Sequence, residues 1–290
     1  MMVPSTGGVR VALHDLSPDG REDHRPPLLL VHATGFHGRV WGPMAAHLPE
    51  LHAWAPDLRA HGDAEVPPDV ELSWHEYAND VLAVVDALAD AGITGDGGLL
   101  AAGHSMGGAT LLLAEIARPG TFRSLYLFEP IVPPPMPELG AGAERPNPLA
   151  EGALRRRATF DSFDAAYENY AGKPPFSGID PAALRAYVDF GFSQQADGTV
   201  RLKCRPEDES ATFRMGMRHG AFERLGEVGC PVTVAVGRAE GEFGPAAFGP
   251  PVVEALPRGR LVTHPDLGHF GPMEAPAAIA ADVRAALVDP

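Results

Sequence analysis

A serine lies between two glycines in the segment AAGHSMGGAT, where Gly103, Ser105 and Gly107 form the pattern GxSxG. An apolar run precedes this serine and a helical pattern follows it, so Ser105 is expected on a sharp strand-to-helix turn. Such a turn needs small residues two places before and after the serine, because the strand and the helix pass close together. The turn exposes the hydroxyl beside the free N–H groups of the helix, which favours nucleophilic attack with a developing oxyanion.

An oxyanion needs a second hydrogen-bond donor, which usually comes from the loop after an earlier strand. The segment LLLVHATGFHGRVW ends a predicted strand at His32 and then turns through Thr34 and Gly35. We therefore expect the backbone N–H of Thr34 in the oxyanion hole, with the N–H of Met106 as the other donor. His32 is expected to brace this loop through hydrogen bonds and not to transfer protons.

Position selects a general base among the twelve histidines of the chain. His269 lies in PDLGHFGPMEAP, a predicted loop between the last strand and the last helix. A base must reach the serine from the same edge of the sheet, and this loop can supply it. His104 points away from the serine at such a turn and His264 lies within a strand pattern, so both are expected to be structural.

The elements that must position these residues alternate between short apolar runs and helical patterns, as in parallel strands joined by crossover helices. Each run is continuous, as expected for strands buried on both faces; the first four cover residues 27–33, 52–58, 98–105 and 124–130. A helix over 73–92 is predicted from the Ser73 and Glu76 capping box, the apolar period and Gly92 as the stop.

The rhythm breaks at 131–148, where prolines and glycines exclude regular elements. The following residues, to about 226, are expected to form helices with no clear strand. Strand patterns return at 230–237 and 259–266, with helices predicted over 246–256 and 275–288. The sequence therefore predicts an α/β core domain, residues 1–132 and 228–290, split by a helical insertion over 133–227.

Four segments, HATGFHGRVW, APDLRAHGDA, GHSMGG and DLGHFGPMEAP, resemble in order and spacing the motifs of the α/β-hydrolase fold superfamily. The resemblance covers the predicted core and not the insertion. It implies a mostly parallel central sheet flanked by helices, His269 as the triad histidine, and a cap over the active site formed by residues 133–227. Ala33 departs from the pattern, because the superfamily usually has a glycine there, and Gly35 is expected to supply the missing backbone freedom.

The resemblance also implies an acid that orients His269, and it offers two positions. The more common one lies three residues after a glycine that ends the strand before the last, and counting from Gly237 gives Glu240. Glu242 is close enough to substitute for it. The other position ends the strand after the nucleophile helix, where Glu129 stands. We favour Glu240 and keep Glu129 as the alternative.

Composition limits the partners. The 290 residues carry 38 acidic and 23 basic side chains, a formal charge of −15, which disfavours nucleic acid and membrane surfaces. The two cysteines, Cys204 and Cys230, have no metal-ligand spacing and suggest neither a disulfide framework nor a zinc site. No signal peptide or membrane-spanning run is apparent, so a cytoplasmic location is expected. No cofactor or metal is implied, and the oligomeric state is left open.

These features predict a serine hydrolase that cleaves carboxylic esters, with lactones and thioesters as related substrates. The insertion is rich in aromatic residues and methionines, some of which, such as Phe192, Met215 and Met217, are candidates to line a pocket for a small apolar substrate. The alternatives on the same fold are a carbon–carbon bond hydrolase, an acyltransferase and a cofactor-free oxygenase. A further alternative is a receptor that binds a small molecule without catalysis.

Overall fold

A computed structural model describes residues 1–17, 25–94, 98–135, 147–239 and 244–288. Its main element is an eight-stranded sheet with the strand order β1-β2-β4-β3-β5-β6-β10-β11. The strands are β1 (Met2–Pro4), β2 (Arg10–Asp15), β3 (Pro27–Val31), β4 (His52–Asp57), β5 (Leu99–His104), β6 (Phe122–Phe128), β10 (Val232–Val236) and β11 (Gly259–Thr263).

The sheet is parallel from β4 to β11, and only β1 and β2 pair antiparallel with their neighbours. The six predicted strand runs all appear as parallel strands of this sheet. Their carboxyl ends meet at one edge, which is where ligands bind in open α/β sheets. The predicted α/β fold class is confirmed.

Helices cover both faces of the sheet. Successive residues of β3 accordingly belong to different clusters of buried side chains. Leu29 and Val31 pack in the cluster that includes α2 (Trp74–Asp90), α3 (Met106–Ala117) and α8 (Pro245–Ala255). Leu28 and Leu30 pack in the cluster that includes α1 (Gly42–Ala45) and α10 (Pro276–Leu287). The alternation follows from the two-residue period of a strand.

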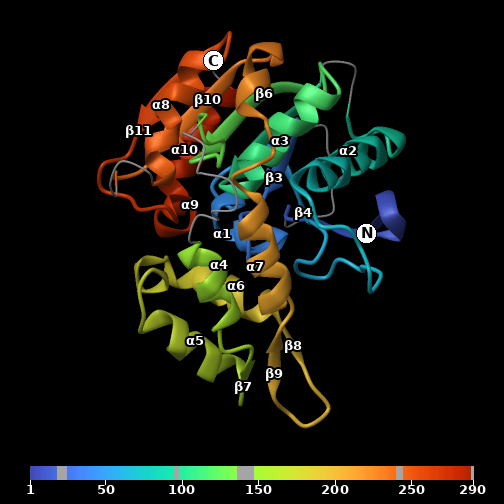
Figure 1. Ribbon diagram of the computed structural model, residues 1–290, viewed down its shortest axis with the longest axis vertical. Coiled ribbons are helices and arrows are strands. Elements are labelled where there is room, and N and C mark those ends of the chain that lie inside the picture. The colour runs from blue at the N-terminus through green and yellow to red at the C-terminus, as the bar shows by residue number, and fades with distance from the viewer. Residues whose placement is uncertain (18–24, 95–97, 136–146, 240–243, 289–290) are drawn as a thin grey trace, which may run out of the picture.

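Most of the segment between β6 and β10, residues 148–215, forms the lower part of the molecule in Figure 1. Its described residues form helices, three short strands and two 3-10 turns. They are α4 (Pro148–Leu154), β7 (Thr159–Phe160), α5 (Phe163–Ala171), η3 (Phe176–Gly178), α6 (Pro181–Gly191), β8 (Phe192–Gln194), β9 (Val200–Leu202), α7 (Pro206–Met215) and η4 (Phe222–Glu227). Asp180 caps α6 as its sequence indicates, accepting a hydrogen bond from the Ala182 N–H at 2.8 Å.

The expectation that this segment lacks strands is wrong, because β7, β9 and β8 form an antiparallel sheet of their own. These strands have two or three residues each, too few to show a period of two in the sequence. The missed signal is the turn Asp197–Gly198, where Gly198 has a φ of 87°. Phe192 belongs to the core of this segment, since it is buried and its ring lies 5.8 Å from that of Phe160.

Candidate active site

Ser105 lies on a strained turn between β5 and α3. Its φ of 56° and ψ of −115° lie outside the regions that most residues adopt. A β-carbon at Gly107 would lie 2.2 Å from the Val31 carbonyl oxygen, and one at Gly103 would lie 2.8 Å from the Gly107 backbone. The two glycines of GxSxG are therefore required by the close approach of α3 to the ends of β3 and β5.

His269 connects Ser105 to a carboxylate. Its Nε2 lies 3.1 Å from the Ser105 Oγ, and its Nδ1 lies 2.5 Å from the Glu129 Oε2. The histidine side chain keeps 29% of its surface exposed, whereas the carboxylate keeps only 2%. The serine and histidine singled out from the sequence thus lie within hydrogen-bond distance, together with the acid that the sequence ranks second.

Glu129 is held by the backbone of β10 and of Gly237, the residue that follows β10. It follows β6 with a φ of 44°, and its N–H donates to the Ala235 carbonyl at 2.8 Å. Its Oε1 accepts a hydrogen bond from the Gly237 N–H at 2.7 Å, which leaves Oε2 for His269. Glu240 and Glu242, the other candidate acids, lie outside the residues that the structure describes.

Two contacts that the sequence did not reveal fix the loop of His269. The buried His104 donates from Nε2 to the carbonyl oxygen of His269 at 2.7 Å, and burial holds the pKa of His104 well below its ordinary value. The Glu274 carboxylate accepts a hydrogen bond from the Gly268 N–H at 2.8 Å. These groups come from β5 and α9 (Gly271–Glu274), and no local motif indicates their pairing with the loop.

The loop after β3 turns tightly between Ala33 and Phe36, whose N–H donates to the Ala33 carbonyl at 3.1 Å. Gly35 occupies the third position of this turn with a φ of 79°, a conformation that favours glycine. Gly35 thus supplies the freedom that Ala33 lacks. Thr34 is buried in this turn.

His32 braces the same loop as a neutral ring. Its Nδ1 donates to the Ala33 carbonyl at 2.8 Å, and its Nε2 accepts from the Leu58 N–H at 3.1 Å. Burial, reinforced by the nearby His61, lowers the pKa of His32 to about 3. Because both ring nitrogens are occupied, His32 holds the end of β3 against the end of β4.

Met106 begins α3 next to this loop. A β-carbon at Gly107 would lie 2.7 Å from the His32 carbonyl oxygen, so the start of α3 and the loop carrying Thr34 meet at one corner. The first N–H groups of a helix have no partner within the helix. The N–H of Met106, at the first position of α3, is one of these groups.

One group of acidic and histidine side chains in the described part of the chain has the spacing to hold a metal ion: His14, Asp57 and Asp63. Their atoms already have protein partners. Asp57 binds the His14 ring at 2.9 Å and the N–H groups of Gly38 and Asp63 at 2.6 and 2.7 Å. Lys203 pairs with Asp63 at 2.5 Å. These contacts give the group a structural role in bracing the loop after β4.

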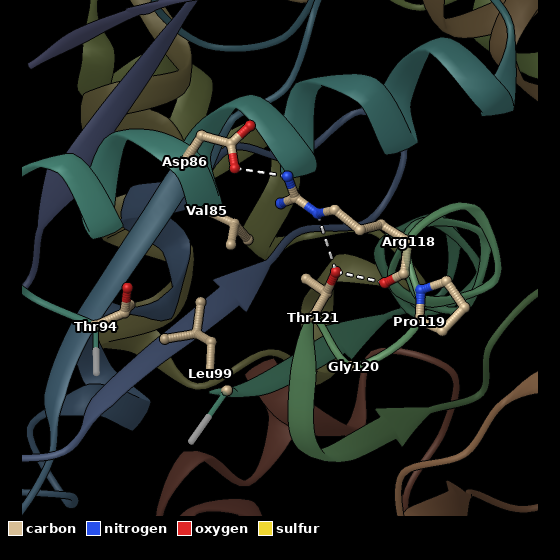
Figure 2. Close-up of a pocket in the computed structure, with 9 residues that line it drawn as sticks. Val85, Asp86, Thr94, Leu99, Arg118, Pro119, Gly120 and Thr121 are labelled. Carbon is tan, nitrogen blue, oxygen red and sulfur yellow. Dashed lines mark hydrogen bonds and ion pairs between the residues drawn. The ribbon is translucent and has the colours of Figure 1, made fainter. Parts of the chain in front are cut away.

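A surface pocket lies between α2, the start of β5 and the end of α3 (Figure 2). In the figure Arg118 pairs with Asp86 at 2.6 Å and donates from Nε to the Thr121 hydroxyl at 3.2 Å. Leu99 begins β5, so the pocket lies at the amino ends of the strands. Ser105 and Glu129 follow the carboxyl ends, and the pocket is not part of their site.

The sequence matches the alpha/beta hydrolase family over residues 28–282. The chain belongs to the alpha/beta hydrolase family. Among solved structures, this hydrolase resembles E-2-(acetamidomethylene)succinate hydrolase with a TM-score of 0.75 at 19% identity, over 100% of this chain and 99% of the other. This likeness confirms the fold.

Curated relatives are similar to the hydrolase over part of its length. It is 31% identical to lipase LipV of Mycobacterium tuberculosis over 162 residues, which are 56% of each chain. It is also 31% identical to monoglyceride lipase of Homo sapiens over 109 residues, 36% of this chain and 35% of the relative. The chain thus spans about half the length of the first of these relatives and about a third of the second.

Among the described helices of the hydrolase, none combines the length and the apolar character needed to cross a membrane.

Proposed function

We propose that this protein is a serine hydrolase that cleaves carboxylic esters through an acyl-enzyme. The observation that carries the proposal is one continuous chain of contacts, from the Ser105 Oγ to the His269 Nε2 at 3.1 Å and from its Nδ1 to Glu129 at 2.5 Å. A nucleophile, a base and an orienting acid in this order form a catalytic triad.

In the proposed reaction the Ser105 Oγ attacks the acyl carbon while the His269 Nε2 accepts the hydroxyl proton. Glu129 accepts a hydrogen bond from the Nδ1–H of His269. This bond keeps Nε2 free of a proton before attack and stabilises the imidazolium that forms. His269 then gives the proton to the departing alcohol. Water repeats the same steps on the acyl-enzyme and releases the acid.

The negative oxygen of each tetrahedral intermediate is assigned to the backbone N–H groups of Thr34 and Met106. The corner at which the Thr34 loop meets the start of α3 supports this assignment. Donors that are fixed before the reaction need no reorganisation when charge develops on the oxygen.

The proposal takes Glu129 as the acid in place of Glu240. A carboxylate that is 2% exposed and already binds the Gly237 N–H is well suited to fix one tautomer of His269. We propose no role for Glu240, which lies outside the described residues.

The substrate is proposed to be a small apolar ester. Support comes from the lipases among the relatives and from the aromatic surroundings of the site. The ring of Phe36, in the Thr34 loop, lies 5.2 Å from that of Phe270, next to His269, and 6.0 Å from that of Phe176. Phe176 belongs to the segment 133–227, which is proposed to act as a cap over Ser105.

A fluorophosphonate probe tests the activated serine, because it reacts only with a nucleophile of this kind. We expect it to label the wild type and to lose the label in Ser105→Ala, while His269→Ala labels far more slowly. A panel of p-nitrophenyl esters of rising chain length, a lactone and a thioester then tests the substrate class.

The outcomes separate the alternatives. No labelling of the folded wild type would refute the proposal and leave a small-molecule receptor. Labelling without hydrolysis of any ester in the panel would retain the activated serine but reject the ester substrate, in favour of carbon–carbon bond cleavage, acyl transfer or cofactor-free oxygenation.

A further inference from the structure

A buried ion pair in the segment between β6 and β10 lies against the Thr34 loop. Arg156 follows α4 and Glu209 lies in the first turn of α7. The Arg156 Nη1 lies 2.6 Å from each carboxylate oxygen of Glu209, and the two side chains are 17% and 6% exposed. Arg156 Nη2 also donates to the hydroxyl groups of Tyr170 and Tyr187. Three side chains therefore fix the position of the Arg156 guanidinium.

This pair contacts Gly35 directly. A β-carbon at Gly35 would lie 2.4 Å from the Glu209 Oε1 and 3.2 Å from the Arg156 Nη1. The carboxylate thus packs on the backbone at the one residue of the turn that has a positive φ. The next residue is held as well, since the Phe36 ring lies 5.1 Å from the ring of Tyr187.

The contacts with Gly35 matter because the residue before it is Thr34. In the proposed function the N–H of Thr34 binds the oxyanion, and such a donor must lie within about 2.7–3.1 Å of the developing charge. A displacement of about 1 Å in a catalytic group can cost about a hundredfold in rate. The hydrogen bond from the Phe36 N–H to the Ala33 carbonyl forms the turn, whereas the ion pair packs against it at Gly35.

We propose that Arg156 and Glu209 are positioning residues: from the segment 133–227 they hold the Ala33–Phe36 turn, and through it the Thr34 amide, in the geometry that stabilises the oxyanion. This inference rests on the proposed function. The pair touches the loop and not the reacting atoms, so its removal should affect the transition state more than substrate binding.

The test variant is Arg156→Met/Glu209→Met. Removing one partner alone would leave an uncompensated buried charge and destabilise the protein, whereas replacing both by apolar side chains is often neutral for stability. Thermal unfolding first establishes that the variant is folded. Arg156→Lys is the second variant: it keeps the charge, but one ammonium group cannot reproduce the fork that binds Glu209 and both tyrosines.

Two measurements follow. Hydrogen–deuterium exchange of a peptide covering residues 33–38 reports on the turn without requiring any activity, and we expect exchange to be at least about tenfold faster in the double variant. With the best ester of the panel, kcat should fall at least about tenfold while KM stays within about threefold. Arg156→Lys should change both quantities in the same direction by a smaller factor.

Arg185→Met is the matched control. Arg185 lies in the same segment and pairs with Asp164 at 2.7 Å and Asp189 at 2.6 Å, but it is 40% exposed. Because exposed pairs contribute little to stability, both measurements should match the wild type.

A folded double variant whose loop exchange and kcat both stay within about twofold of the wild type would overturn the inference. If the double variant does not fold, the same result in Arg156→Lys overturns it. Failure of the proposed function gives a different result. Suppose that loop exchange is faster in the double variant and that no fluorophosphonate labels the wild type. This result would support the role of the ion pair in holding the turn and would reject the serine hydrolase.

Discussion

Replacing Glu129 by glutamine tests the acid of the site with little disturbance of the fold. The Glu129 Oε1 accepts the Gly237 N–H at 2.7 Å, and Oε2 lies 2.5 Å from the His269 Nδ1. Glutamine can keep the first bond through its amide oxygen, which turns its NH2 group toward Nδ1. Since that group only donates, Nδ1 must accept, and the ring proton moves to Nε2 beside Ser105.

The size of the effect follows from this tautomer. A ring with its proton on Nε2 cannot accept the proton of Ser105, and the same change in a serine protease triad lowers kcat about 10⁴-fold. That factor corresponds to about 5 kcal/mol of transition-state stabilisation, at about 1.4 kcal/mol for each factor of ten. Alanine at 129 would in addition leave the buried Gly237 N–H unpaired, at a cost of about 1–3 kcal/mol in stability.

The assay compares Glu129→Gln, Glu240→Gln and Glu242→Gln with the wild type, by kcat on one p-nitrophenyl ester and by thermal unfolding. Glu129→Gln should remain folded and lose activity, though less than Ser105→Ala or His269→Ala, for which about 10⁶-fold is expected. The variants at 240 and 242 should stay near the wild type. If Glu129→Gln kept more than about a tenth of the activity while Glu240→Gln lost it, the tautomer argument would be refuted.

Three further predictions concern buried groups. Burial lowers the pKa of His32 to about 3 and that of His37 to about 4, whereas the unfolded chain takes up these protons near pH 6.5. The free energy of unfolding should therefore fall from pH 6.5 toward pH 4, by about 2 kcal/mol for each histidine at pH 5, which urea unfolding at pH 7 and pH 5 would measure. Gly107→Ala places a β-carbon 2.2 Å from a backbone oxygen of β3 and should cost about 3 kcal/mol or prevent folding. Gly152→Ala, with no atom within 4 Å, should be neutral or stabilising in the same unfolding assay. Burial raises the pKa of Cys230 to about 12, and both thiols are buried. A disulfide reagent should accordingly find no reactive thiol until urea is added, and rapid native labelling would contradict this.

The parts of the site that could be predicted from the sequence are those with local causes. GxSxG indicates the turn of Ser105 because the glycines answer a steric demand within a few residues, and the collisions at Gly103 and Gly107 express that demand. His269 is indicated by its place between the last strand and the last helix. The Ser105 Oγ and the His269 Nε2 lie 3.1 Å apart because the parallel sheet brings the carboxyl ends of its strands together at one edge.

The parts that escaped prediction depend on contacts between distant segments. His104 reaches the carbonyl of His269 across 165 positions of sequence, and Arg156 reaches Glu209 across 53. A histidine next to the nucleophile and an arginine in LRRRA have many ordinary explanations, so neither residue indicates its partner. The strands β7, β8 and β9 escaped for a related reason, because each is too short to show its period alone.

The choice between Glu129 and Glu240 turns on Gly237, the residue from which the sequence count begins. In the structure this glycine donates its N–H to Glu129, and a β-carbon there would lie 3.1 Å from the Glu129 Oε1 and 2.6 Å from the Leu267 carbonyl oxygen. A glycine at the end of β10 is thus explained by the approach of the Glu129 carboxylate and the histidine loop. The explanation requires no acid three residues later, so the glycine that suggested Glu240 is equally required if Glu129 orients His269. Gly237→Ala should therefore lower activity through His269 even where Glu240→Gln does not, and equal loss in both variants would favour the later glutamate.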